Sequence, residues 1–308
     1  MIQEPIEILK LHPIRKSRKQ KEAFRRDVMA YGEKLGYSVT VEKGSFGARN
    51  VILGNPATAK YLISAHYDTP ASIGLPNLIT PCNLFTYILW QIIMVGIFFL
   101  FAFAVGIPVY FLTKSREIGL LAGYIAYFGL LLLLLLGPAN KNNANDNTSG
   151  VVTVLETART MPENLRGQVA FLLFDLEEAG LIGSSSYAKA HKEEIKTQII
   201  LNLDCCGDGD HIIFFPTKKA KKDEALMKRL HRLGGWFGSK HIQLKSKGFY
   251  TYPSDQKNFP VGIGIAAFKK ARFAGYYCNK IHTKKDTTLE LTNVNLLRTA
   301  LTTLISEL

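Results

Sequence analysis

The sequence contains little cysteine. Its four cysteines, Cys82, Cys205, Cys206 and Cys278, form no Cys-x-x-Cys pair and no spacing typical of a disulfide scaffold. The adjacent Cys205 and Cys206 cannot easily converge on one tetrahedral metal ion. We therefore expect four free thiols, which suit a reducing compartment, and we interpret Cys205 and Cys206 as small buried side chains.

The sequence is also poor in acidic residues relative to basic ones, and its N-terminal stretch, MIQEPIEILKLHPIRKSRK, has no apolar run. We therefore expect no secretory signal. The 38 Lys and Arg against 25 Asp and Glu give a net charge of +13. Such a surplus can indicate nucleic acid, an anionic membrane surface or solvated faces. No recognised nucleic-acid module is present, so we expect no nucleic-acid partner and favour the membrane surface.

Charge is absent altogether from two long runs, residues 84–112 and 118–136. As a helix, the second run would be about 28 Å long at about 1.5 Å per residue, close to the thickness of a bilayer core. The first run is longer, so either Pro108 ends its helix early or the helix tilts. The alternative is a buried helical hairpin in the core of a soluble protein. The length of both runs favours a transmembrane hairpin.

The hairpin interrupts a sequence of ordinary α/β composition. Gly119 and Gly123 have the spacing that lets two membrane helices pack closely. We predict an inserted transmembrane hairpin over 82–136, in contact with lipid through 84–136, and a single domain made of 1–81 and 137–308. In that domain helices and strands alternate, which indicates an α/β fold with a largely parallel or mixed sheet. The expected helices are 17–36, 150–160, 183–190, 223–235 and 294–307, and the expected strands are 37–41, 50–53, 61–65, 169–174, 199–203 and 266–268.

Two chemically informative segments follow apolar strand-like runs. In YLISAHYDTP, His66 and Asp68 are two residues apart and point to the same side of an extended chain, so Asp68 can orient the histidine. In FLLFDLEEAG, two adjacent carboxylates would repel each other unless a metal ion bound one of them. We therefore interpret Glu178 as a metal ligand and Glu177 as a general base. The alternative is a strand end with solvated acids.

Three further segments supply candidate ligands. Asp146 lies in NNANDNTSGV, where the alternative is a turn with a helix N-cap. Asp204 ends the apolar run IILNLD, a common place for a ligand at the carboxyl edge of an α/β sheet. His282 lies in NKIHTKKD, and Asp286 in the same segment supports that loop or begins the final helical segment.

In this order the segments resemble the family-28 metallopeptidases, zinc aminopeptidases whose relatives include glutamate carboxypeptidases and glutaminyl cyclases. The resemblance covers the chain from about residue 20 to its end, the hairpin excepted. It implies a three-layer α/β/α sandwich around a mixed sheet, with two zinc ions at the edge of the sheet. The metal ligands that it implies are His66, Asp146, Glu178, Asp204 and His282.

The resemblance also implies a role for each residue. Asp146 would bridge the two ions, with His66 and Asp204 completing one site and Glu178 and His282 the other. Glu177 matches the catalytic base, and Asp68 matches the acid behind the first histidine. Carboxylates and imidazoles suit zinc on ligand grounds, and cobalt or manganese could substitute.

The chain departs from the family pattern in two places. The first histidine and the bridging aspartate are usually close in sequence, but here the whole hairpin lies between His66 and Asp146. In SDQKNFP, Gln256 stands where histidine is frequent. Tyr252 is our candidate for the group that polarises the scissile carbonyl.

These features predict a membrane-anchored zinc exopeptidase of the aminopeptidase type, acting on peptides. The alternatives are a single-zinc acyltransferase similar to glutaminyl cyclase and a catalytically silent membrane receptor or scaffold.

Both ends of the hairpin must lie on one side of the membrane, because His66 and Asp146 meet at one site. The basic N-terminal segment favours a cytoplasmic catalytic domain, whereas Lys114 and Arg116 in the turn argue against it. The sequence does not indicate an oligomeric state.

Overall fold

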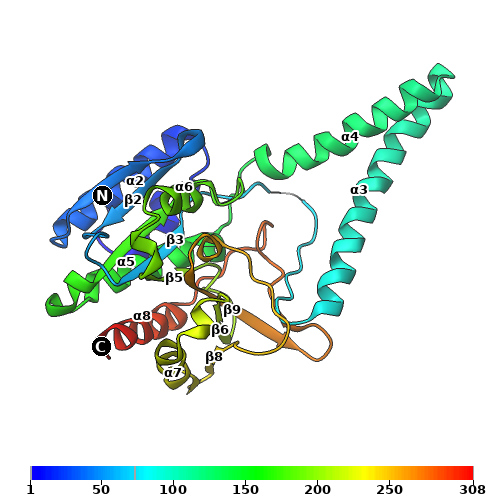
Figure 1. Cartoon of the computed structure of the whole chain (residues 1–308). Coiled ribbons are helices and arrows are strands. Elements are labelled where there is room, and N and C mark those ends of the chain that lie inside the picture. The colour runs from blue at the N-terminus through cyan, green and yellow to red at the C-terminus, as the bar shows by residue number, and fades with distance from the viewer. Residues whose placement is uncertain (1, 73, 308) are drawn as a thin grey trace.

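A computed structural model of the chain describes residues 2–72 and 74–307. Within them, ten strands form one mixed sheet in the order β1-β2-β4-β3-β5-β9-β6-β8-β7, with β10 paired to β9 (Figure 1). The strands are β1 Val39–Lys43, β2 Arg49–Leu53, β3 Tyr61–His66, β4 Val169–Phe174, β5 Ile199–Leu203, β6 His211–Pro216, β7 Gly235–Phe237, β8 Lys240–Leu244, β9 Val261–Ala271 and β10 Gly275–Tyr277. The α-helices are α1 Ile8–Leu11, α2 Arg18–Lys34, α3 Leu84–Thr113, α4 Arg116–Leu136, α5 Gly150–Thr160, α6 Ile182–Ala190, α7 Glu224–Arg232 and α8 Leu291–Ser306.

The centre of the sheet is parallel. β3 pairs in parallel with both β4 and β5, and β5 pairs in parallel with β9. Every residue of β3, β4 and β5 is buried, which explains why these strands are continuous apolar runs without alternation. Because the three strands run the same way, their carboxyl ends meet at one edge of the sheet, where ligands commonly bind in α/β folds.

Helices cover both faces of the sheet. Phe171 and Leu173 of β4 belong to a core that also contains side chains of α2, α5, α7 and α8. The alternate residues Leu172 and Phe174 pack on the opposite face with Tyr187 of α6. The predicted three-layer α/β/α sandwich with a mixed central sheet is therefore confirmed.

The two apolar helices form a hairpin that projects from the sandwich (Figure 1). Each is long and apolar enough to cross a membrane, and only 11% of the most apolar window of each is buried. A buried core hairpin is thus excluded. Glycines permit close contact between the helices: a Cβ on Gly106 would lie 2.8 Å from the carbonyl oxygen of Gly119, and one on Gly123 would lie 3.2 Å from that of Ala102. The first helix continues through Pro108 to Thr113.

The two stems of the hairpin lie against each other. Ala71 and Ala139 form an antiparallel bridge, the N–H of Ser72 donates to the carbonyl of Pro138 at 2.8 Å, and that of Asn140 donates to Pro70 at 2.9 Å. The chain segments that lead into and out of the hairpin therefore pair with each other on the domain, as the sequence required of the ends that bring His66 and Asp146 to one site.

The structure differs from the sequence expectations mainly in the C-terminal half of the sheet. The short strand expected at 266–268 is the middle of β9, which runs from Val261 to Ala271, and β6, β7, β8 and β10 were not predicted. The helix expected at 223–235 ends at Arg232, after which Gly235 begins β7. The first strand begins at Val39, two residues later than expected.

Candidate metal centre

The carboxyl edge of the parallel strands gathers the predicted site residues. His66 is the last residue of β3, Glu177 and Glu178 follow β4, and Asp204 follows β5. Asp146 lies in the irregular turn Ala144–Ser149 that leads into α5, and His282 lies in the loop between β10 and α8. These side chains form one cluster at the edge of the sheet, although His66 and His282 are 216 positions apart in the sequence.

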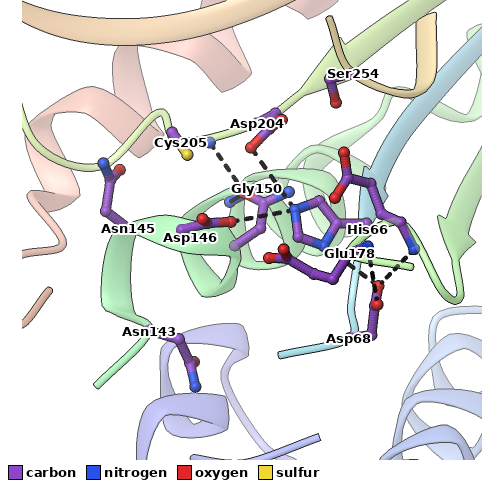
Figure 2. A network of polar contacts seen from close by, with 12 residues as sticks. His66, Asp68, Asn143, Asn145, Asp146, Gly150, Glu178, Asp204, Cys205 and Ser254 are labelled. Carbon is purple, nitrogen blue, oxygen red and sulfur yellow. Dashed lines mark hydrogen bonds and ion pairs between the residues drawn. The ribbon is translucent and has the colours of Figure 1, made fainter. Parts of the chain in front are cut away.

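Asp146 lies between two groups of potential ligands. Its Oδ1 is 3.3 Å from Nε2 of His66, which in turn is 3.7 Å from Oδ1 of Asp204 (Figure 2). Its Oδ2 is 2.9 Å from Nε2 of His282, which is 3.6 Å from Oε2 of Glu178. Each group of three offers ligand atoms within 4.8 Å of one another, and the two groups share Asp146. This is the arrangement that a bridging carboxylate between two metal ions requires.

Asp68 connects the end of β3 to the turn after β4. Its Oδ1 accepts the N–H of Glu177 at 3.0 Å, and its Oδ2 accepts the N–H of Glu178 at 3.2 Å (Figure 2). The same Oδ1 lies 3.4 Å from Nδ1 of His66. Asp68 thus holds the two adjacent glutamates and the histidine in a fixed relation.

Asp286 supports the turn that carries Asp146. Its carboxylate oxygens accept the N–H groups of Asn145 at 2.8 Å and of Asp146 at 3.0 Å. The backbone angles of Asp146 and Asn147 are not helical, and these two hydrogen bonds hold the backbone at this irregular point. The sequence analysis expected Asp286 to support the loop of His282 or to begin the final helical segment, and its contact with the turn of Asp146 was not foreseen.

Negative charge exceeds positive charge in the cluster. Burial raises the pKa of Glu178 to about 8 and that of Glu177 well above its usual range. Burial lowers the pKa of His282, but the carboxylates of Glu178 and Asp146 outweigh it and raise the value to about 9. Oε1 of Glu178 is buried and has no hydrogen-bond partner among the described residues. A bound cation would satisfy both the unpaired oxygen and the excess of acids, so the residues fit a metal centre.

One side of the cluster is more open to solvent than the other. The side chains of His66 and Asp146 are 1% and 4% exposed, whereas those of Glu178 and His282 are 15% and 25% exposed. Glu178 and His282 therefore form the more solvent-accessible side of the cluster.

Arg15 is a buried residue near the cluster that the sequence analysis did not single out. Its guanidinium donates to the main-chain carbonyls of His12 and Tyr67 and to the side chains of Asn143 and Thr148. Burial lowers its pKa to about 10, while the charges of Asp68 and Asp146 favour the cation. Since Tyr67 precedes the hairpin and Asn143 and Thr148 follow it, Arg15 joins the two halves of the site.

The segment SDQKNFP also contributes a residue that was overlooked. Asp255 is fully buried, and burial raises its pKa to about 7. Both ends of the Gln256 side-chain amide are hydrogen-bonded within the protein. Its oxygen accepts from the side chain of Asn202 at 3.1 Å, and its nitrogen donates to the carbonyl of Tyr252 at 2.7 Å. The hydroxyl of Tyr252 donates to the main-chain carbonyl of Asp204 at 3.0 Å, so its role towards a substrate carbonyl stays a prediction. A buried acid in a polar loop carries no sequence signal of its own.

The cysteines agree with the sequence expectation. All four are free, and Cys205 and Cys206 are 4% and 0% exposed. Burial raises the pKa of the Cys206 thiol to about 11, so this residue is a small buried side chain, as predicted.

Solved structures share this fold. The glutaminyl cyclase of Porphyromonas gingivalis matches with a TM-score of 0.60 and 16% identity over 98% of this chain and 94% of that chain. The glutaminyl cyclase of Fimbriiglobus ruber has a TM-score of 0.56 and 16% identity over 99% and 95%. The LapA aminopeptidase of Legionella pneumophila has a TM-score of 0.56 and 14% identity over 98% and 69%. A search of curated proteins finds no sequence match.

A family model assigns the chain to a protein family, whereas these distant structures show only its fold. Residues 134–305, more than half of the chain, match the model of peptidase family M28. The match contains Asp146, Glu177, Glu178, Asp204 and His282. It begins within the last turn of α4, so His66 and Asp68, which precede the hairpin, lie outside it. The family resemblance seen in the sequence is confirmed, and the chain belongs to peptidase family M28.

Proposed function

We propose that the protein is a two-zinc exopeptidase of the aminopeptidase type, anchored in a membrane by α3 and α4. Membership in a peptidase family supports amide hydrolysis as the reaction. The observation that carries the two-metal proposal is the position of Asp146, whose two oxygens face separate groups. His66 and Asp204 complete one metal site, and Glu178 and His282 complete the other.

Zinc bound at these residues would supply Lewis acidity and a water molecule of lowered pKa. Glu177 lies within 4.8 Å of His66 and Glu178, close enough to take a proton from an attacking water. As the water oxygen bonds to the carbonyl carbon, Glu177 holds that proton and then delivers it to the leaving nitrogen as the C–N bond breaks. Asp68 keeps Glu177 in place through its main-chain N–H.

An aminopeptidase must also hold the free α-amino group of its substrate. The acidic side chains at the more open side of the cluster suit a cationic amine, and Glu178 is the most exposed acid among the proposed ligands, at 15% against 4% for Asp146 and 11% for Asp204. The buried Arg15 does not pair with Glu178, because its guanidinium donates to backbone and neutral side-chain oxygens. We therefore place the substrate N-terminus beside Glu178.

The membrane anchor is supported by the length and exposure of the two helices. Lys16 donates to the carbonyl of Leu135 at 3.1 Å, which puts a basic side chain at the domain end of α4. We propose a cytoplasmic catalytic domain, with Ser115 in the turn on the opposite side. A membrane-impermeant thiol reagent should label a Ser115→Cys variant in intact cells. Labelling only after lysis would reverse the orientation.

Zinc analysis and a substrate screen test the proposal. We expect two zinc ions per chain and hydrolysis of aminoacyl or dipeptide reporters, with activity lost on chelation and restored by zinc. One zinc ion per chain together with cyclisation of N-terminal glutamine would favour the acyltransferase alternative, which shares its fold with the glutaminyl cyclases. Two zinc ions without turnover of any reporter would favour a silent receptor or scaffold.

A further inference from the structure

An apolar cavity lies where the hairpin meets the catalytic domain. Its volume is about 310 Å³, and its walls come from three segments: the stem at Asn77 and Ile79, the first half of α3 at Tyr87, Gln91 and Met94, and the end of α4 at Leu131. Figure 1 shows the two helices converging at their distal ends and diverging toward the domain, so the cavity lies in the wide part of the wedge.

Two aromatic rings line this cavity halfway along the hairpin. Phe98 of α3 and Tyr127 of α4 both line it, with their ring centroids 5.9 Å apart. A larger apolar cavity of about 590 Å³ lies farther along the hairpin, but all of its lining residues belong to α3 and α4. Of these two cavities, the one beside Asn77 is lined both by the hairpin and by the stem that joins it to the catalytic domain.

The floor of the cavity is bonded to the loop that carries His282. The side-chain amide of Asn77 donates to the carbonyl of Ile281, the residue before His282, at 3.3 Å. Ile79 and Cys278 exchange two main-chain hydrogen bonds at 2.8 and 2.9 Å. A residue of the cavity wall is therefore bonded to the neighbour of His282, the more exposed of the two histidines in the proposed metal centre.

An exposed amide of the first apolar helix also lines the cavity. Gln91 is the only Asn or Gln in the uncharged run 84–112, and it lines the cavity. A polar group within a membrane segment is costly and usually serves a function. An amide can satisfy the N–H and C=O groups of a peptide backbone, which are equally costly to leave unpaired in an apolar environment.

We infer that this cavity binds the apolar, membrane-inserted segment of a peptide substrate whose free N-terminus reaches the metal centre. The inference rests on the proposed peptidase function. Apolar walls pack against the side chains of such a segment, and the amide of Gln91 bonds to its backbone polar groups, while Asn77 ties the cavity to the loop of His282. The substrates are then peptides with a short polar N-terminal stretch that continues into the bilayer.

A matched pair of peptides tests the inference with full-length protein in phosphatidylcholine nanodiscs. Both begin with the same leucine and serine residues; one continues as a run of leucine and alanine, the other as a run of serine and glycine. We expect kcat/KM for the apolar-tailed peptide to exceed that for the polar-tailed one by about tenfold or more. Met94→Trp, which fills the cavity, should reduce this ratio towards one. Ile92→Trp is the control, because Ile92 is 62% exposed on the same helix and does not line the cavity.

Partitioning of the apolar peptide into the nanodisc alone would raise the ratio equally in both variants, and that outcome overturns the inference. A benzophenone in the apolar tail provides a readout that needs no turnover. Crosslinks should map to 87–98 of α3 and 127–134 of α4 and should diminish in Met94→Trp. Crosslinks spread over the outward faces of the helices would also overturn the inference. If neither peptide is hydrolysed, the peptidase function fails while the crosslinks still decide whether the cavity binds the tail.

Discussion

The carboxylate of Asp68 accepts the main-chain N–H of Glu177 at 3.0 Å, and its second oxygen accepts the N–H of Glu178. One side chain thereby positions both the proposed base and a proposed ligand. We predict that Asp68→Ala lowers kcat by about 10- to 100-fold, the usual effect of losing a residue that orients metal ligands. Asp68→Asn keeps one acceptor oxygen and should lose less. Equal, small effects of both variants in steady-state assays would show that Asp68 does not position the turn.

Glu177 is predicted to move protons without holding metal. Glu177→Gln preserves its size and hydrogen bonding but cannot accept the proton of water. We expect kcat to fall by about 10²- to 10⁴-fold while the zinc content of the purified protein stays unchanged. Glu163→Gln is a suitable control, because Glu163 is exposed in the turn before β4. Activity near that of the parent in Glu177→Gln would rule out the assigned role.

The stem after α4 holds the loop of His282. Asn140 donates to the carbonyl of Thr283 at 3.0 Å, and Asn142 donates to that of Lys284 at 2.7 Å. His282 has a φ of +59°, a conformation that a residue with a side chain keeps only when its surroundings enforce it.

We therefore predict that Asn142→Ala combined with Asn140→Ala weakens zinc binding by about tenfold or more, since His282 loses the support of its backbone. Competition with a fluorescent zinc chelator measures the affinity. Asn295→Ala is the matched control, because Asn295 is exposed on α8. An affinity equal to that of the control would mean that the stem only connects the hairpin to the domain.

Arg15 is predicted to stabilise the fold. Arg15→Met removes the donors of four oxygen atoms, among them the carbonyl of Tyr67 and the hydroxyl of Thr148, and leaves them buried. We expect a loss of about 3 kcal/mol in the free energy of unfolding, seen as a lower thermal midpoint of the purified protein. Arg18→Met, at an exposed position of α2, should leave the midpoint nearly unchanged. Similar midpoints for both variants would contradict this role.

The parallel centre of the fold was predictable from sequence because its strands are apolar on both faces. β3, β4 and β5 were found almost to the residue. β9 was largely missed, since Gly262 and Gly264 lie within it and weaken any strand pattern. The structure explains the first glycine: a Cβ on Gly262 would lie 2.4 Å from the main-chain oxygen of Gln256, so the close approach of that backbone requires glycine.

Site residues that lie in motifs of the family could be predicted from the sequence. Residues whose role depends on contacts between distant parts of the chain could not. His66 ends β3, and Glu178 and Asp204 follow β4 and β5, so their placement at one edge followed from the fold. Arg15 had no such signal, because its partners Asn143 and Thr148 are 128 and 133 residues away in sequence. The contacts of Asn140 and Asn142 with the His282 loop were invisible for the same reason.

The central claim is that Asp146 bridges two metal ions, and anomalous diffraction at the zinc absorption edge tests it most directly. Crystals of the zinc-loaded protein should show two anomalous peaks, one between Asp146, His66 and Asp204 and the other between Asp146, Glu178 and His282. A single peak, or none, from protein loaded with excess zinc would contradict the account.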